Sequence, residues 1–377
     1  MENSSIDTRI NTKSDAYIVF AVFLQFFLVI LQHSIMLFFG TNESIVTTFR
    51  VVSTIIVLVP AIVISYRRKP LLWVSVYLLA IVVLLLNIIW FPKNEIFLRY
   101  DALRFTMPIV IPSALCLMTI SDINVVERVL LKLSWAAFVF SILYLAAILV
   151  GVASVDHYNM SYGYALLLPA ITLYSQKTKW SIVSSLIMII SVLIIGSRGP
   201  LLIFLVYITI DMVQRSTKMI PFFIVLIVVI LMILPQVVIL LESKGIYSRT
   251  LQYAMEGSLS QDSGRGVLLS RMKDALMQNF WGIGLWGDRT LLNGLYCHNI
   301  LYEIIGDFGW LLGLFIIGLL AFYIIRCLVF SNKQNRILLI KYICALLIYL
   351  FVSGSYLTSY NFGSFVGLLY LFNKSIK

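Results

Sequence analysis

Apolar runs of about 20 residues recur along the chain, and each is long enough for one α-helix to cross the hydrocarbon core of a bilayer. Only 12% of the residues are charged, about half the share of a soluble domain, so this chain could not cover a water-facing surface. The runs do not alternate apolar with polar residues, as the strands of a membrane barrel do. The sequence therefore predicts an all-α, polytopic transmembrane protein with about twelve spans.

We expect the whole chain, residues 1–377, to form a single integral membrane domain. The expected spans cover residues 17–38, 45–65, 71–91, 103–120, 131–152, 160–175, 180–196, 200–214, 219–241, 309–330, 337–354 and 356–372.

Lys and Arg concentrate in alternate connections between these spans, among them 66–70 and 326–341. Basic residues mark the cytoplasmic ends of membrane helices. We therefore expect both termini in the cytoplasm, and the long polar connection 242–308 on the outer face of the membrane.

The net charge of +11 follows from these basic helix ends. No basic stretch interleaved with aromatic residues resembles an RNA-binding motif, so we expect no nucleic-acid partner. The cysteines are scattered and form no CxxC pair, which argues against a zinc site or a disulfide framework. They are Cys116, Cys297, Cys327 and Cys344.

The connection 242–308 is too long for an ordinary loop, and loops of this length are usually functional or disordered. The residues of this connection predict an ordered structure, because Asp262 or Ser263 is suited to cap a helix near 265–279. In that helix four apolar residues fall on one stripe, which would cover a cavity or lie on the membrane. They are Leu268, Leu269, Met272 and Leu276. The glycine-punctuated stretch 281–287 predicts a tight loop.

Two arginines on the outer side are candidates for binding an anion, because guanidinium matches phosphate oxygens and keeps its charge. Arg198 lies in the tight hairpin GSRGP, and Arg265 lies in DSGRG at the start of the expected loop helix. An arginine that reaches toward lipid headgroups is the alternative for Arg198. Three further arginines are weaker candidates, because a solvated loop charge is their usual explanation: Arg249, Arg271 and Arg289.

His298 is the candidate general base. It precedes Asn299, which is suited to cap a helix that begins at Ile300. A helix N-terminus and nearby arginines disfavour the imidazolium ion, so the ring should be neutral near pH 7, as a base requires. His157 lies on the same side of the membrane and is the rival candidate.

Glu303 and Asp307 are four residues apart and therefore share one helix face. They are suited to orient a partner or to bind sugar hydroxyls. A solvated helix face explains the same spacing equally well.

Several motifs are missing: DxD for a metal-bound nucleotide sugar, GxxxxGK[ST], HExxH and GxSxG. We therefore expect neither a metal nor a cofactor.

Five motifs together resemble the O-antigen polymerase and O-antigen ligase superfamily of bacterial membrane glycosyltransferases. They are MSYGYALLLPAI at 160–171, GSRGPLL at 196–202, SGRG at 263–266, WGIGLWG at 281–287 and HNILYEIIGDFGWLLG at 298–313. Each motif alone is weak, and the resemblance depends on their order and spacing over roughly residues 155–330.

This resemblance implies an all-helical lipid-linked-sugar transferase, GT-C-like in class, in the bacterial cytoplasmic membrane. It implies metal-independent, inverting transfer of a glycan from an undecaprenyl-diphosphate-linked oligosaccharide donor to an acceptor. The implied roles are diphosphate binding by Arg198 and Arg265 and assistance to the acceptor hydroxyl by His298. The supporting candidates come from the sequence itself and not from the resemblance: Asn299, Glu303, Arg249, Arg271 and His157.

The motifs do not separate the two reactions of this superfamily. A polymerase joins repeat units of O-antigen or capsule, and a chain-length regulator protein would suit it as a partner. A ligase moves the finished glycan to the lipid A core of lipopolysaccharide. The short, aromatic-rich chain, divergent in its first half, looks more like the polymerases of this superfamily. A polysaccharide flippase is the alternative outside these enzymes, although its polar sites would be expected at the membrane midplane.

Overall fold

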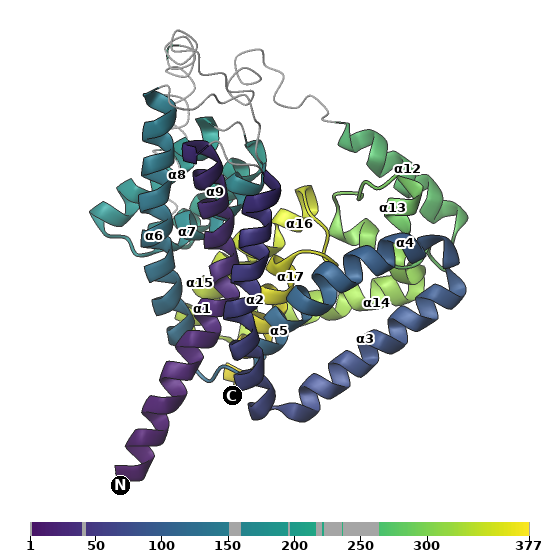
Figure 1. Cartoon of the computed structure of the whole chain (residues 1–377), viewed down its shortest axis with the longest axis horizontal. Coiled ribbons are helices and arrows are strands. Elements are labelled where there is room, and N and C mark those ends of the chain that lie inside the picture. Colours follow the sequence, from purple (N-terminus) through teal and green to yellow (C-terminus); the bar gives the residue numbers. More distant parts are fainter. Residues whose placement is uncertain are drawn as a thin grey trace. The chain divides into compact units, whose positions relative to one another are not determined.

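The computed structural model describes residues 2–39, 43–150, 160–194, 197–215 and 264–376, together with positions 221 and 236. Within these residues all regular secondary structure is helical (Figure 1), which confirms the expected all-α class.

The N-terminal helices are α1 (Glu2–Phe39), α2 (Glu43–Arg68), α3 (Pro70–Trp90), η1 (Pro92–Asn94), α4 (Glu95–Phe97), the π-helical η2 (Leu98–Val110), α5 (Ile111–Met118) and α6 (Ile123–Leu149). The central helices are α7 (Met160–Ser175), α8 (Lys179–Ile194) and α9 (Arg198–Arg215). The C-terminal helices are α12 (Arg265–Gln278), α13 (Gly287–Leu291), α14 (Ile300–Phe330), α15 (Lys333–Tyr342), the π-helical η3 (Ile343–Leu347), α16 (Tyr349–Val352) and α17 (Tyr360–Ser375).

Within the described residues, seven helical segments are long and apolar enough to cross a membrane. They are Thr12–Met36, Ser44–Arg68, Pro70–Trp90, Pro92–Met118, Ile123–Ile148, Ile300–Phe330 and Lys333–Val352. The expected spans within 160–214 and 356–372 coincide with the shorter helices α7, α8, α9 and α17. The expected span 219–241 lies outside the described residues, apart from positions 221 and 236.

The chain divides into two compact units. Unit 1 contains residues Met1–Ile18, Val59–Ile123 and Asp262–Lys377. Unit 2 contains residues Val19–Leu58 and Asn124–Gln261. The single integral membrane domain expected from the sequence stays a prediction, and each unit is described by itself below.

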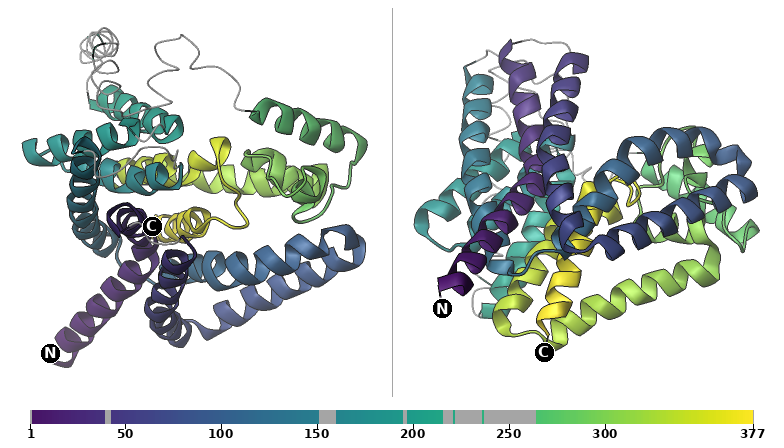
Figure 2. Two further views of the ribbon diagram at one scale, coloured as in Figure 1. Left: turned by 45° about the horizontal axis from the view of Figure 1, so that its top comes forward. Right: turned by 60° about the horizontal axis from the view of Figure 1, so that its bottom comes forward.

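In unit 1, α3 and the segment from η1 to α5 lie side by side as an antiparallel pair (Figure 2), where the Tyr77 hydroxyl donates to the Met107 carbonyl at 2.8 Å. Helix α17 packs closely on α5, because Gly363 and Gly367 bring no side chain into the contact. A Cβ atom at Gly363 would lie 2.2 Å from the Val110 carbonyl oxygen. A pair of small residues four apart is a common device for close helix packing in membranes.

In unit 2, α7 is buried along almost its whole length, from Tyr162 to Tyr174. Hydroxyl groups join its neighbours: Ser141 and Ser191 lie 3.1 Å apart across α6 and α8. His33 of α1 packs edge-on against Tyr162, with ring centroids 5.8 Å apart.

Helix α14 is interrupted at Gly309, where φ is +75° and ψ is 174°. The preceding loop supplies hydrogen bonds at the break: Ile283 N donates to Gly306 O at 2.7 Å, and Trp310 N donates to Phe280 O at 3.0 Å. The tight loop expected at 281–287 is thus confirmed, since Gly282 and Gly284 also have positive φ. The sequence did not indicate that this loop docks into the break of the long helix α14.

Gly309→Ala is expected to destabilise the protein by about 1 kcal/mol or more, because φ is positive there and a Cβ would lie 2.6 Å from the Trp281 carbonyl carbon. Gly318→Ala in the same helix is the matched control, since a Cβ there meets nothing within 4 Å. The control should raise stability by about 0.5–1 kcal/mol through its higher helix propensity. Thermal unfolding in detergent measures both, and equal shifts would contradict the role of the break.

Candidate functional site

Arg289 of α13, in unit 1, joins a buried ionic cluster. Its side chain is only 4% exposed. Nη1 lies 2.7 Å from Asp288 Oδ1 and 3.1 Å from Glu303 Oε1, while Nε lies 3.3 Å from Asp101 Oδ2. The interpretation of Arg289 as a solvated loop charge is therefore wrong.

The charges of this cluster depend on one another. Burial by itself would lower the pKa of the Arg289 guanidinium, but Asp288 and then Glu303 raise it above its ordinary value. A buried cation of this kind is tolerated only because its partners are present. Three acidic side chains from η2, α13 and α14 thus converge on one guanidinium and tie these helices together.

Glu303 lies in the first turn of α14 and is 1% exposed. Besides Arg289, it accepts hydrogen bonds from the Ser355 hydroxyl and, at 3.1 Å, from Tyr356 N. One turn later, Asp307 accepts a hydrogen bond from the Tyr356 hydroxyl at 2.6 Å. The two acids share a face, as expected, but the alternative of a solvated face is wrong because both are buried.

The ionic cluster continues into the turn at residues 296–299. Asp288 Oδ2 accepts a hydrogen bond from Cys297 N at 3.1 Å. Asn299 is the N-cap of α14, and its side-chain oxygen accepts from Leu301 N at 3.0 Å and Tyr302 N at 3.4 Å. The cap and the first helical residue, Ile300, are those expected from the sequence.

His298 lies between Cys297 and Asn299, the two residues held by these hydrogen bonds. It is half-buried and has a left-handed φ of +57°. Its ring centroid lies 4.1 Å from that of Tyr296. Its Nδ1 atom is buried and has no hydrogen-bond partner among the described residues. Burial, and then the charge of Arg265, lowers the pKa of His298 to about 4, so the ring is neutral at pH 7.

The expected loop helix is confirmed as α12, and it begins at Arg265. Its N-cap is Gly264, with φ of +82°, rather than Asp262 or Ser263. Glycine takes this backbone angle without a steric penalty. The other two positions lie outside the described residues.

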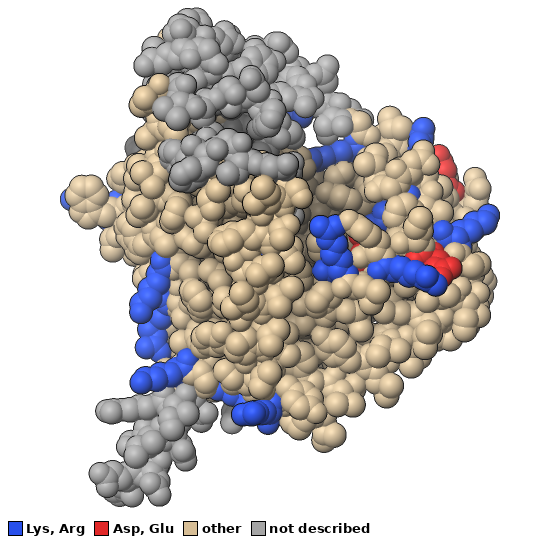
Figure 3. Space-filling model, viewed as in Figure 1, with Lys and Arg blue, Asp and Glu red and all other residues tan. Residues whose placement is uncertain are grey.

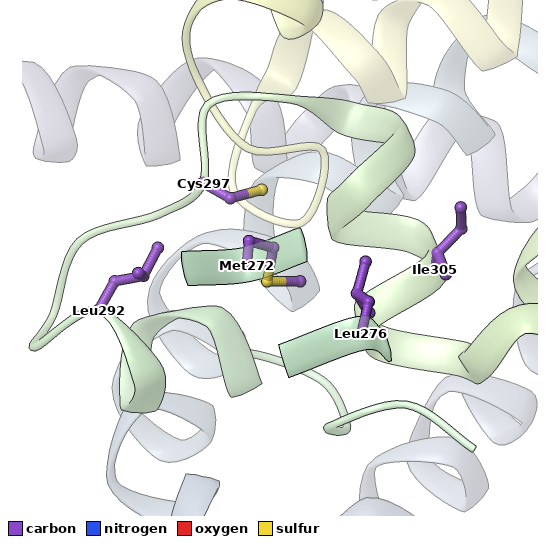
Figure 4. Close-up of a cluster of buried hydrophobic side chains, with 5 residues drawn as sticks. All are labelled: Met272, Leu276, Leu292, Cys297 and Ile305. Carbon is purple, nitrogen blue, oxygen red and sulfur yellow. The ribbon is translucent and has the colours of Figure 1, made fainter. Parts of the chain in front are cut away.

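Helix α12 is held on α14 by apolar contacts, so Arg265 lies on a supported element (Figure 4). Met272 and Leu276 of the expected stripe are buried. With them cluster Leu292, Cys297 and Ile305. The Trp310 indole N–H also donates to the Leu276 carbonyl at 3.0 Å. Arg271, a supporting candidate on the same helix, is exposed.

Arg198 is the first residue of α9 in unit 2 and is half-buried. The preceding Ser197 is buried, and its N–H donates to Val192 O at 3.2 Å. Gly199 serves a close approach rather than an unusual backbone angle, because a Cβ there would lie 1.9 Å from the Tyr164 hydroxyl. The grouping of Arg198 with the unit 1 residues stays a prediction.

Two supporting candidates, His157 and Arg249, lie outside the described residues. Of the aromatic residues near the site, Trp286 is fully buried and Trp281 is 76% exposed. In Figure 3 the acidic side chains visible on this face lie beside Lys and Arg, over the region labelled α4, α12 and α13 in Figure 1.

Sequence reasoning missed Asp101, Asp288 and Tyr356 and undervalued Arg289. One signal was present: GDRT places adjacent opposite charges inside an otherwise apolar, glycine-rich loop. Asp101 gave no such signal, because the expected spans place it in the connection between 71–91 and 103–120.

The fold and the site together define an all-helical protein with helices of membrane-spanning length, in which a buried ionic cluster adjoins a neutral histidine. No protein-family model matches the chain, and no curated protein or solved structure shows significant similarity to it.

Proposed function

We propose that this protein is a polysaccharide polymerase of the bacterial cytoplasmic membrane, with about twelve spans and a GT-C-like fold. It joins undecaprenyl-diphosphate-linked repeat units of O-antigen or capsule on the outer face. The observation that carries the proposal is His298, a neutral imidazole whose Nδ1 has no hydrogen-bond partner within the described part of the chain, held at the start of α14 beside the charge of Arg265.

The donor has a hydrocarbon tail and a diphosphate head, and unit 1 has surroundings suited to the tail. An apolar cavity of about 570 Å³ lies between α3 and α14, lined by Leu86, Trp90 and Leu312 among others. Hydrocarbon placed there avoids water. Arg198 and Arg265 are assigned to the head, where fixed guanidinium groups stabilise the charge that develops on the leaving diphosphate.

The acceptor sugar hydroxyl approaches His298. The imidazole takes the hydroxyl proton while the oxygen attacks the anomeric carbon of the donor from the face opposite the diphosphate. A new C–O bond forms, and the bond to the diphosphate breaks with inversion. The diphosphate leaves with the electron pair, and His298 passes its proton to water.

Two alternatives remain. An O-antigen ligase would use the same residues with lipid A core as the acceptor. A flippase would move the lipid-linked unit without changing it. The position of His298 in the 264–300 segment, outside the apolar body of α14, favours an enzyme over a transporter with a midplane site.

The decisive experiment mixes purified protein with lipid-linked repeat units, with and without a chelator, and sizes the products on a gel. A ladder of longer glycans that is unchanged by the chelator is expected. Lipid-linked repeat units that stay unchanged would argue for the flippase. Transfer of glycan only to lipid A core would identify a ligase.

Arg198→Lys is expected to lower polymer formation by about 10- to 100-fold, because an ammonium group cannot reproduce the two parallel hydrogen bonds of guanidinium. Arg198→Ala should lose at least as much. The rate of product formation at equal protein levels measures both, and Arg128→Ala, an exposed arginine of the same unit, is the control. Wild-type ladders from Arg198→Ala would remove the diphosphate role.

Arg265→Ala should give a similar loss, with Arg271→Ala, exposed on the same helix, as its matched control. Because both arginines lie on α12, a loss confined to Arg265→Ala separates anion binding from packing of the helix. Equal losses from both variants would contradict a specific role for Arg265.

A further inference from the structure

We propose that Asp288 is a positioning residue for His298, acting through the main chain of the 296–299 turn. This inference rests on the proposed function for its catalytic consequence, but its structural part is testable without any glycan.

The Asp288 carboxylate is fully buried and uses both oxygens. Oδ1 accepts from the backbone N–H of Arg289 at 2.9 Å and from its Nη1 at 2.7 Å. Oδ2 accepts from the backbone N–H of Cys297 at 3.1 Å. One carboxylate therefore links the guanidinium of the ionic cluster to the backbone N–H of Cys297, the residue immediately before the histidine.

The next residue needs such support. His298 has a φ of +57°, a backbone conformation that costs free energy for a residue with a Cβ and persists where the surroundings enforce it. Asn299 fixes the other side of the turn as the cap of α14. The histidine is thus held between a hydrogen bond to Asp288 on one side and a helix start on the other.

The aromatic neighbour is held by the same cluster. The ring centroids of Tyr296 and His298 lie 4.1 Å apart. Arg289 Cζ lies 5.8 Å from the ring centroid of Tyr296. Gly294 N also donates to Arg289 O at 2.7 Å, which closes the loop that leads to this tyrosine. Asp288 fixes Arg289, and Arg289 in turn supports the ring that contacts His298.

These contacts give the buried charges of the ionic cluster a role in a protein of this composition. The oxygens of Asp288 are occupied by Arg289 and Cys297, so the carboxylate affects the reaction by fixing the imidazole rather than by contact with substrate. Loss of the Cys297 hydrogen bond would free the turn to leave its left-handed conformation, and the Nδ1 atom would lose its fixed direction.

The first test compares Asp288→Ala and Asp288→Asn with Asp274→Ala, an exposed acid on α12. Asp288→Ala should lower kcat by about 10²-fold with KM for the donor nearly unchanged, the usual effect of misplacing a catalytic group. Asp288→Asn should recover part of the rate, because its amide oxygen still accepts from Cys297 N. Its NH2 group then faces the Arg289 donors from which Asp288 Oδ1 accepts, so the link to Arg289 is lost. Asp274→Ala should match wild type.

The second test needs no glycan. Diethyl pyrocarbonate modifies neutral imidazole, and peptide mass spectrometry reports the rate at His298 alone. This rate should rise several-fold in Asp288→Ala, rise less in Asp288→Asn, which keeps the hydrogen bond from Cys297 N, and be unchanged in Asp274→Ala. If Asp288→Ala does not fold, Arg289→Lys takes its place, because it weakens the same link while keeping the charge.

Unchanged labelling of His298 in Asp288→Ala, or in Arg289→Lys where that variant replaces it, would overturn the positioning role. So would a loss of kcat in Asp288→Asn as large as in Asp288→Ala. Failure of the proposed function gives a different result. If Asp288→Ala speeds the labelling of His298 but polymer formation does not depend on His298, Asp288 keeps its positioning role. The catalytic role of His298 is then removed.

Discussion

Replacing Arg289 by alanine is expected to lower the free energy of unfolding by about 3–5 kcal/mol, the usual cost of removing one partner from a buried ion pair. The variant would leave the side chains of Asp101, Asp288 and Glu303 facing one another without the guanidinium that all three contact. Urea or thermal unfolding in detergent, followed by helical circular dichroism, measures the loss.

Arg99→Ala is the control for this variant, because Arg99 is 73% exposed and pairs with Glu95 on the same helical segment. Exposed pairs contribute less than about 1 kcal/mol, so its stability should change little. A similar small change for Arg289→Ala would contradict the central place of the ionic cluster in unit 1.

Replacing His298 by alanine is expected to reduce polymer formation by about 10²- to 10⁴-fold, the contribution of a positioned general base. Donor binding should persist, because the diphosphate is assigned to Arg198 and Arg265. His298→Gln should retain slightly more activity by orienting the hydroxyl without accepting its proton. Single-turnover rates and binding of the lipid-linked donor measure the two effects separately.

His157→Ala is the paired control, since the sequence places this histidine on the same side of the membrane. A normal product ladder from His298→Ala, or complete loss from His157→Ala alone, would transfer the catalytic role to the loop that contains His157.

The same imidazole predicts a pH dependence. Because burial and then Arg265 lower the pKa of His298 from 6.5 to about 4, the unfolded chain binds a proton here at intermediate pH and the folded protein does not. The stability contributed by the neutral ring is present above pH 6.5 and is lost as the pH falls toward 4. His298→Gln should remove this part of the acid sensitivity, measured as the change in unfolding midpoint between pH 7 and pH 4.5. Equal acid sensitivity in wild type and His298→Gln would contradict the lowered pKa.

Local patterns in the sequence predict the helices well. The start of α14 is an example, since an Asx cap and its helix are set by neighbouring residues, and Asn299 and Ile300 were expected there. The apolar stripe of α12 is another, because spacing along one helix determines which side chains share a face.

The ionic cluster could not be predicted in the same way. Asp101, Arg289 and Tyr356 come from distant parts of the chain, and their proximity depends on how α5 packs on α17 and how the 280–286 loop enters the break in α14. Without those contacts, Arg289 resembles any arginine of a polar loop. Glycine 309 likewise gives no local sign that its helix is interrupted, because glycine is common in membrane helices.

The buried state of the native thiols has a practical consequence. Cys116, Cys297, Cys327 and Cys344 are all free and buried, and burial, followed by Glu303, raises the pKa of the Cys297 thiol. Thiolates are the species that react with maleimides, so the natural chain already provides a nearly silent background for site-directed labelling. Single reporter cysteines at exposed positions such as 273 and 333 can then be introduced without first deleting any native residue. A reagent that cannot cross the bilayer would in this way read out the sidedness of each connection in intact cells.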